Sequence, residues 1–169
     1  MKVHMDESFN AEEQFLYNDT YLFIKGYATG RQFAQTLKAL PLARKFHNGQ
    51  YRKGNVTIAG LDYKLPYVFH CLKVCSTLIS LELPLAHDEL DTLFAAALLH
   101  DSLEDATHIF DGINDKAIMA SYGISGDVYE CVKLVSKAHE CDDNQLDEYF
   151  NKIRTNKLAI FIKLADRSH

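Results

Sequence analysis

The sequence has little of what marks membrane proteins and secreted proteins. It has no tryptophan, three prolines and four cysteines in 169 residues. No run of about 18 apolar residues could span a bilayer. The N-terminal stretch MKVHMDESFNAEEQ carries acids where a secretory signal needs an apolar run. We therefore expect a cytoplasmic protein that binds no membrane.

The cysteine and charge patterns exclude further classes. The cysteines form neither a CxxC pair nor a dense framework, so we expect reduced thiols that pack as small hydrophobic side chains (Cys71, Cys75, Cys131 and Cys141). The net charge of -5 argues against binding to nucleic acid, which relies on a broad field of Lys and Arg. Neither a phosphate-cradling GxxxxGK nor a dinucleotide-binding GxGxxG is present. A small anionic molecule remains possible where local cations meet it.

The sequence does contain apolar patterns with the period of a helix. Its 47% hydrophobic content is enough for the core of one domain. Pro41 should kink or split the first helix, Pro66 should begin the second, and Asp88 should cap the third. The apolar run 158–166 could be a buried strand, but we expect a helix because no partner strands are evident. The helices are expected at 30–48, 66–83, 88–101, 114–122, around 128–135, 142–154 and 158–166.

Two regions lack this period. Residues 1–30 mix acids with aromatic side chains, and we expect an N-terminal extension that packs on the core. Residues 50–65 carry Gly54, Gly60 and Asp62, which favour a loop, with a short hairpin as the alternative.

The most informative stretch is LLHDSLEDA, which places His100, Asp101, Glu104 and Asp105 at the end of an apolar helix. If the helix continues, His100 lies one turn from Glu104 and Asp101 one turn from Asp105. A solvated helix end is the ordinary interpretation of such acids. That interpretation is less favourable if the helix end is buried, because each unsatisfied buried polar group costs about 1 to 3 kcal/mol of stability. A metal ion would satisfy them if further ligands converge.

Two further ligands are available in distant segments. His70 follows Pro66 closely, and Asp166 closes the apolar run IFIKLAD. Alone, the histidine is more often a hydrogen-bonded structural residue, and the aspartate is more often a cap or an ion-pair partner. Their joint occurrence with the His-Asp pair favours a metal site.

As a whole this pattern resembles the HD superfamily of metal-dependent phosphohydrolases, and more narrowly the hydrolase domain of the RelA/SpoT family. The segments ARKFHNGQYRK, PYVFH, AALLHDSLEDA, LVSK and IKLADRSH carry the resemblance over residues 31–169. It implies an all-α fold, the HD-domain helical bundle. It also implies a bound Mn²⁺ and a guanine nucleotide substrate, guanosine 3',5'-bispyrophosphate (ppGpp) or its pentaphosphate relative. The implied reaction uses a metal-bound water to release pyrophosphate from the 3' position.

The resemblance also assigns roles to residues. It makes His70, His100, Asp101 and Asp166 the metal ligands. Glu104 and Asp105 would orient the water and move its protons, while Arg52 and Lys53 would contact the guanine and the phosphates. The ligand types alone suit Mn²⁺, Fe²⁺ or Zn²⁺, so they leave the metal open. We interpret His47, which also matches a family position, as a structural residue at a helix end.

The chain departs from the family at two places. Residues 54–65 exceed the usual short spacer, and the chain stops at LADRSH where the family continues, so we expect a C-terminal truncation. These 169 residues are too few to include the synthetase domain of the long bifunctional members, so we do not expect synthesis of alarmone. Two rivals remain: a phosphohydrolase of another nucleotide, such as a nucleotidase or an NADPH phosphatase, and an alarmone-binding module without turnover. The sequence leaves the oligomeric state open.

Overall fold

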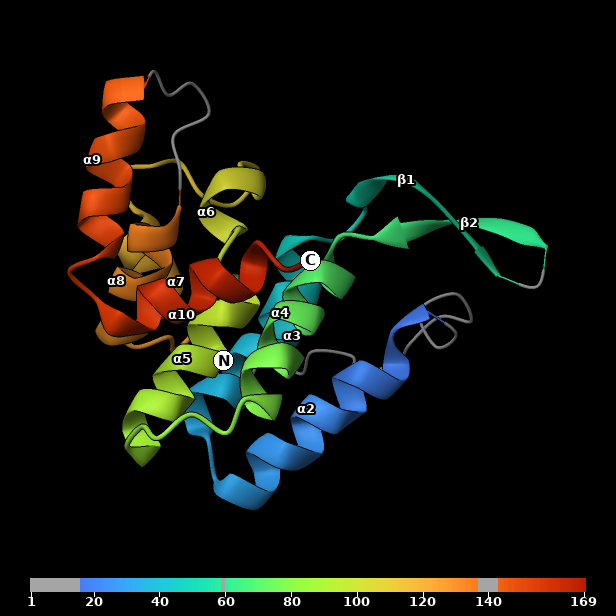
Figure 1. Ribbon diagram of the computed structural model, residues 1–169, viewed down its shortest axis with the longest axis horizontal. Helices are drawn as coiled ribbons and strands as arrows, with labels where there is room; N and C mark the ends of the chain where they lie inside the picture. The colour runs from blue at the N-terminus through green and yellow to red at the C-terminus, as the bar shows by residue number, and fades with distance from the viewer. Residues whose placement is uncertain (1–15, 59, 137–142) are drawn as a thin grey trace.

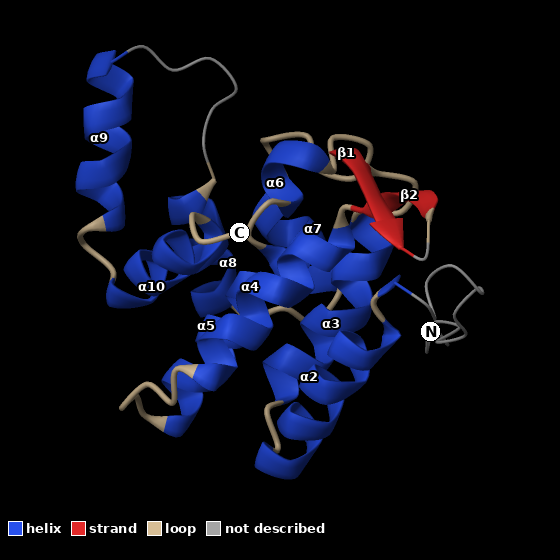
Figure 2. Ribbon diagram, turned by 45° about the vertical axis from the view of Figure 1, so that its right-hand side comes forward, coloured by secondary structure: helices blue, strands red, loops and turns tan. Residues whose placement is uncertain are grey.

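A computed structural model describes residues 16–58, 60–136 and 143–169, and within these ranges the protein is mostly helical with one two-stranded hairpin (Figures 1 and 2). The prediction of a mainly helical fold is therefore confirmed, with a small hairpin added to the helices, and the HD-domain arrangement stays a prediction. The elements are α2 (Asn18–Arg31), α3 (Ala34–Phe46), β1 (Tyr51–Ile58), β2 (Leu61–Pro66), α4 (Val68–Ser80), α5 (His87–Leu99), α6 (Ser102–Asp105), α7 (Asp115–Ser121), α8 (Gly126–Val135), α9 (Asp143–Ile153) and α10 (Lys157–Asp166).

Helix α5 is the centre of the fold. Every side chain from Leu93 to Leu99 is buried, and the helix contacts α3, α4, α8 and α10. The small side chains of 95–97 let these neighbours approach closely. Because α5 runs through the core, the residues that follow its C-terminal end are also inside the protein.

A buried aspartate joins α5 to α3. Asp91 accepts hydrogen bonds from the backbone N–H groups of Gln35 and Thr36, at 2.9 and 2.7 Å, and from the Thr36 hydroxyl at 2.8 Å. These N–H groups lie in the first turn of α3 and have no partner within that helix. The carboxylate thus satisfies a helix N-terminus and is itself satisfied.

Residues 16–30 belong to the core more fully than the sequence suggested. Tyr17, Tyr21, Ile24 and Ala28 are buried at the spacing of one helix face, and α2 packs against α3 and α4. The expectation of no regular period is therefore wrong for this part. Aromatic and polar residues share α2, which hid the stripe. Residues 1–15 lie outside the described ranges.

The segment after α3 forms the hairpin, which was the alternative to a plain loop. Strands β1 and β2 pair antiparallel, with Val56 opposite Tyr63 and Ile58 opposite Leu61, and Gly60 takes a φ of 80° in the turn. The hairpin projects from the helical body, and its main contacts are between its own strands (Figure 1). Pro66 ends β2 and does not begin the next helix, which starts at Val68.

Several predicted boundaries move. Pro41 lies inside α3 without splitting it, and Ala86, not Asp88, precedes α5, with the Glu89 carboxylate accepting the N–H of Ala86 at 3.1 Å. Asn156 caps α10, which confirms a helix at 158–166. The expected start of α9 at residue 142 lies outside the described residues. None of the described helices has the length and apolar character needed to cross a bilayer.

Candidate metal centre

Three helices bring distant polar residues to one place. His70 lies in the first turn of α4, His100 directly follows α5, and Asp166 is the last residue of α10. Helix α10 packs against both α4 and α5, so the three helix ends meet. The apolar faces of these helices therefore determine where the polar side chains lie.

The ligand atoms of this cluster are close together. His70 Nε2 is 3.1 Å from Asp166 Oδ1, and His100 Nε2 is 3.7 Å from the same oxygen. Asp101 Oδ2 is 3.0 Å from His100 Nε2 and 3.7 Å from His70 Nε2. The structure thus brings together the four residues that the sequence singled out. The buried group of His70, His100 and Asp166 could hold a metal ion.

The His100 ring supplies the best test of whether a cation fits. Its Nδ1 lies 2.8 Å from the Ala97 carbonyl, so this nitrogen carries a proton and donates. Its Nε2 is buried and has no hydrogen-bond partner among the described residues, although Asp101 is near, because the two groups are not aligned for one. When Nε2 carries no proton it presents a lone pair, so a divalent cation that replaces the Nε2 proton would satisfy both this buried nitrogen and the two carboxylates beside it.

The charges in the cluster are strongly coupled. Burial lowers the pKa of His100, but the nearby carboxylates of Asp101 and Asp166 outweigh burial and raise it above its ordinary value. Burial raises the pKa of both carboxyl groups, yet the histidines lower each of them below its usual range. Without an ion, the cluster therefore retains a proton. A cation that enters would replace this proton.

Two residues that the sequence analysis missed support the carboxylates. The Tyr67 hydroxyl donates to Asp101 Oδ2 at 2.7 Å, and Lys163 Nζ donates to Asp166 Oδ2 at 2.8 Å. The lysine leaves Asp166 Oδ1 to face the histidines. Lys163 could have been found from spacing, because it precedes Asp166 by three residues on α10. Tyr67 precedes α4 and its partner Asp101 is 34 residues away, so no local spacing indicated it.

The two predicted basic residues of β1 differ in their contacts. Arg52 points to the cluster, where its Nη1 lies 3.4 Å from His70 Nδ1. Its other nitrogen donates to the His169 carbonyl at 3.3 Å. Lys53 is exposed, in a part of β1 where the pairing with β2 is irregular between Tyr51 and Asn55. The structure therefore brings Arg52 to the site and does not bring Lys53.

The contact of Arg52 with His70 depends on the tautomer of the ring. Arginine only donates, so His70 Nδ1 must accept and carry no proton. A histidine that offers its Nε2 lone pair to an ion carries its proton on Nδ1. The contact and ion binding through Nε2 thus exclude each other, and an ion on His70 would release Arg52.

The acidic pair lies in a separate short helix. Helix α5 ends at Leu99, so the expected continuous turn from His100 to Glu104 is wrong, although the Asp105 N–H still donates to the Asp101 carbonyl at 2.9 Å. Both carboxylates are half-buried. The charge of Glu104 contributes to the raised pKa of Tyr149 in α9, after the larger effect of burial. The charge of Asp105 contributes in the same way to the raised pKa of Tyr67, again after the larger effect of burial.

His47 occupies the position expected of a structural residue. It directly follows α3, it is buried, and its Nδ1 lies 2.7 Å from Gln50 Oε1. The amide of Gln50 also donates to the Asp105 carbonyl at 2.7 Å. Burial lowers the pKa of His47, so its ring is neutral at physiological pH. The hydrogen bonds of His47 and Gln50 connect the C-terminal end of α3 to α6.

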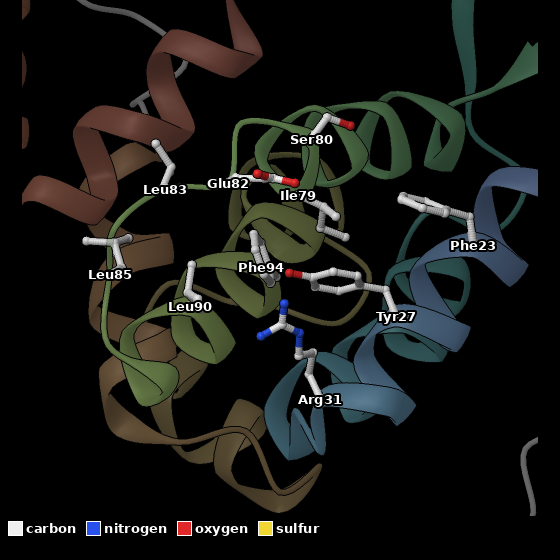
Figure 3. Close-up of a pocket in the computed structure, with 10 residues that line it drawn as sticks. All are labelled: Phe23, Tyr27, Arg31, Ile79, Ser80, Glu82, Leu83, Leu85, Leu90 and Phe94. Carbon is white, nitrogen blue, oxygen red and sulfur yellow. The ribbon is translucent and has the colours of Figure 1, made fainter.

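A cavity of about 590 Å³ lies elsewhere, between α2, the C-terminal end of α4 and α5 (Figure 3). Tyr27, Arg31 and Phe94 are among its lining residues, and the Arg31 guanidinium lies 5.6 Å from the centre of the Tyr27 ring. None of the predicted site residues lines this cavity. The metal cluster and the cavity are therefore separate features.

No model of a known protein family matches this chain. The family assignment therefore stays a prediction from the sequence motifs.

Proposed function

We propose that this protein is a metal-dependent phosphohydrolase that removes pyrophosphate from the 3' position of ppGpp or its pentaphosphate relative. The observation that carries the proposal is the cluster of His70, His100 and Asp166, with a buried imidazole nitrogen that lacks a partner. The substrate is inferred from the sequence motifs, which resemble those of alarmone hydrolases. The cluster supplies a place for the ion that such chemistry uses.

We further propose that Asp101 is the fourth ligand and that the ion is Mn²⁺. The Asp101 carboxylate is as close to the two histidines as Asp166 is. Two imidazoles and two carboxylates suit Mn²⁺ and leave coordination positions open. An ion held there supplies Lewis acidity, which lowers the pKa of water and offsets the charge of phosphate oxygens. Tyr67 and Lys163 hold the two carboxylates in the orientation that faces the ion.

The acidic pair is proposed to handle protons. Glu104 and Asp105 follow Asp101 within one helical turn, so their carboxylates belong to the same part of the protein as the ligands. A carboxylate within reach of the attacking water can orient it and accept its proton. An alarmone-binding module without turnover would not need acids there, because they repel the phosphates.

Arg52 is proposed to bind the substrate. A guanidinium can meet phosphate oxygens in pairs and can stack on a purine. Arg52 already lies beside the cluster, and ion binding at His70 would release it from the ring nitrogen. The arginine then becomes available at the moment when an anionic substrate can bind. Lys53 is exposed to solvent, so its contribution to the affinity for phosphate is smaller.

The experiment that tests the proposal is a pyrophosphate-release assay on ppGpp. The chain is stripped with a chelator and assayed before and after Mn²⁺ is restored, with deoxynucleoside triphosphates and NADPH as competing substrates. We expect Mn²⁺-dependent release of pyrophosphate from ppGpp only. Turnover of another nucleotide in place of ppGpp would reassign the substrate, and ppGpp binding without turnover would make the protein a binding module.

A further inference from the structure

A buried cysteine lies beside the metal cluster. Cys71 follows His70 in α4, and its side chain is fully buried. Its sulfur, a ring nitrogen of His100 and a carboxylate oxygen of Asp101 all lie within 4.8 Å of one another. Neither the sequence motifs nor the proposed hydrolysis uses this thiol.

The thiol shares a neighbour that is itself unsatisfied. His100 is 2% exposed, and its Nε2 lacks a hydrogen-bond partner among the described residues. Ligand atoms around a tetrahedral zinc ion lie about 3.3 to 3.6 Å apart, given bonds of about 2.0 to 2.3 Å. Small side-chain rotations would bring the three atoms to these separations. Sulfur, nitrogen and oxygen ligands together suit a soft cation better than Mn²⁺.

We propose that Cys71, His100 and Asp101 form a second binding mode of this centre, which takes a thiophilic divalent ion such as Zn²⁺ or Cd²⁺. His100 belongs to both modes, so a soft ion held by Cys71 excludes Mn²⁺ from the group of His70, His100 and Asp166. Binding forms the metal–sulfur bond and releases the thiol proton to solvent. The inference rests on the metal centre of the proposed function and does not depend on the nucleotide substrate.

The chain offers a matched control. Cys75 lies four residues further along α4 and is also fully buried, but it belongs to no group of candidate ligands among the described residues. Cys141 lies outside the described residues, so all test proteins carry Cys141→Ser. Cys71→Ala and Cys75→Ala are then compared in this background. Both substitutions remove one buried sulfur from the same helix.

The test is a titration with Cd²⁺, without nucleotide, followed by ultraviolet absorbance and by the electron paramagnetic resonance signal of released Mn²⁺. We expect one equivalent of Cd²⁺ to produce a thiolate charge-transfer band and to release Mn²⁺ in the parent protein and in Cys75→Ala. Cys71→Ala should lose the band and need at least about tenfold more Cd²⁺ to release Mn²⁺.

A second measurement protects the test if Cys71→Ala does not fold. The ¹¹³Cd resonance of the parent protein should shift strongly downfield, as sulfur ligation requires. A resonance typical of nitrogen and oxygen ligands alone, or an unchanged band in folded Cys71→Ala, would overturn the proposal. Failure to hydrolyse ppGpp would leave these spectra unaffected, so the two proposals fail separately.

Discussion

The cluster of His70, His100 and Asp166 and the hairpin β1–β2 differ in how much packing fixes their positions. His70, His100 and Asp166 lie at the ends of three helices whose apolar faces pack into one core. The hairpin that carries Arg52 projects from that core, and its contacts are mainly internal (Figure 1). The core thus fixes the positions of these three side chains. The hairpin instead carries the charged side chain of Arg52, whose contact with the cluster depends on the tautomer of His70.

The largest effect should come from removing a ligand of the cluster. His70→Ala or Asp166→Ala should lower the Mn²⁺ affinity by more than about 100-fold and abolish hydrolysis, because even supporting residues of metal sites contribute about 10- to 100-fold. Metal analysis after gel filtration measures the first and the pyrophosphate assay the second. Leu164→Ala is the control, since Leu164 is an exposed residue on the same helix as Asp166. If Asp166→Ala retained its full metal content, Asp166 would not be a ligand of the ion.

The next effect separates chemistry from metal binding. Glu104→Gln should keep the metal and lower kcat by about 10²- to 10⁴-fold, because it removes a proton acceptor and preserves the side-chain shape. Metal analysis and steady-state kinetics on one preparation measure both quantities. Unchanged kcat would remove the catalytic assignment of Glu104.

The two basic residues of β1 test the hairpin directly. Arg52→Ala should raise KM for ppGpp by about 10- to 100-fold, as expected for loss of a charged hydrogen bond. Lys53→Ala should change KM by at most about fivefold, because its side chain points to solvent. Equal effects of the two substitutions would show that the hairpin turns when substrate binds.

The affinity for metal should depend on pH. The carboxylates overcome burial and raise the pKa of His100, so the ion-free cluster holds a proton at neutral pH. An entering ion must displace this proton, and the affinity should rise by up to about tenfold per pH unit between pH 6 and 8. Isothermal titration calorimetry in buffers of different ionisation enthalpy counts the protons released. A pH-independent affinity would mean that the cluster is already unprotonated.

The smallest effects concern stability. Asp91→Ala should lower the free energy of unfolding by about 1 to 3 kcal/mol, because it leaves the N–H groups of α3 unsatisfied in the core. Val56→Ser, at an exposed position of β1, should change it by at most about 0.5 kcal/mol. Urea denaturation of both variants compares the core with the hairpin. A larger loss in Val56→Ser would indicate that the hairpin packs on something else.

The sequence allowed the longer helices after residue 30 and the four clustered residues to be predicted, because both depend on periodic burial, whereas α2 was missed. His100 and Asp101 were identified by an apolar helix that ends in polar groups, and Asp166 by the same pattern. The short helix α6 and the orientation of Arg52 could not be predicted. The orientation of Arg52 depends on the strand pairing of β1, which is irregular between Tyr51 and Asn55, and no sequence pattern indicated such an irregularity. The role of Asp91 was also hidden, since its partners lie 55 and 56 residues away.

We propose above all that one cation lies between His70, His100 and Asp166. Crystals grown with Mn²⁺ and measured at its absorption edge would locate the ion through its anomalous scattering. We predict a single strong peak within bonding distance of His70 Nε2, His100 Nε2 and Asp166 Oδ1. A peak elsewhere, or side chains that keep their ion-free contacts with no peak between them, would contradict the account.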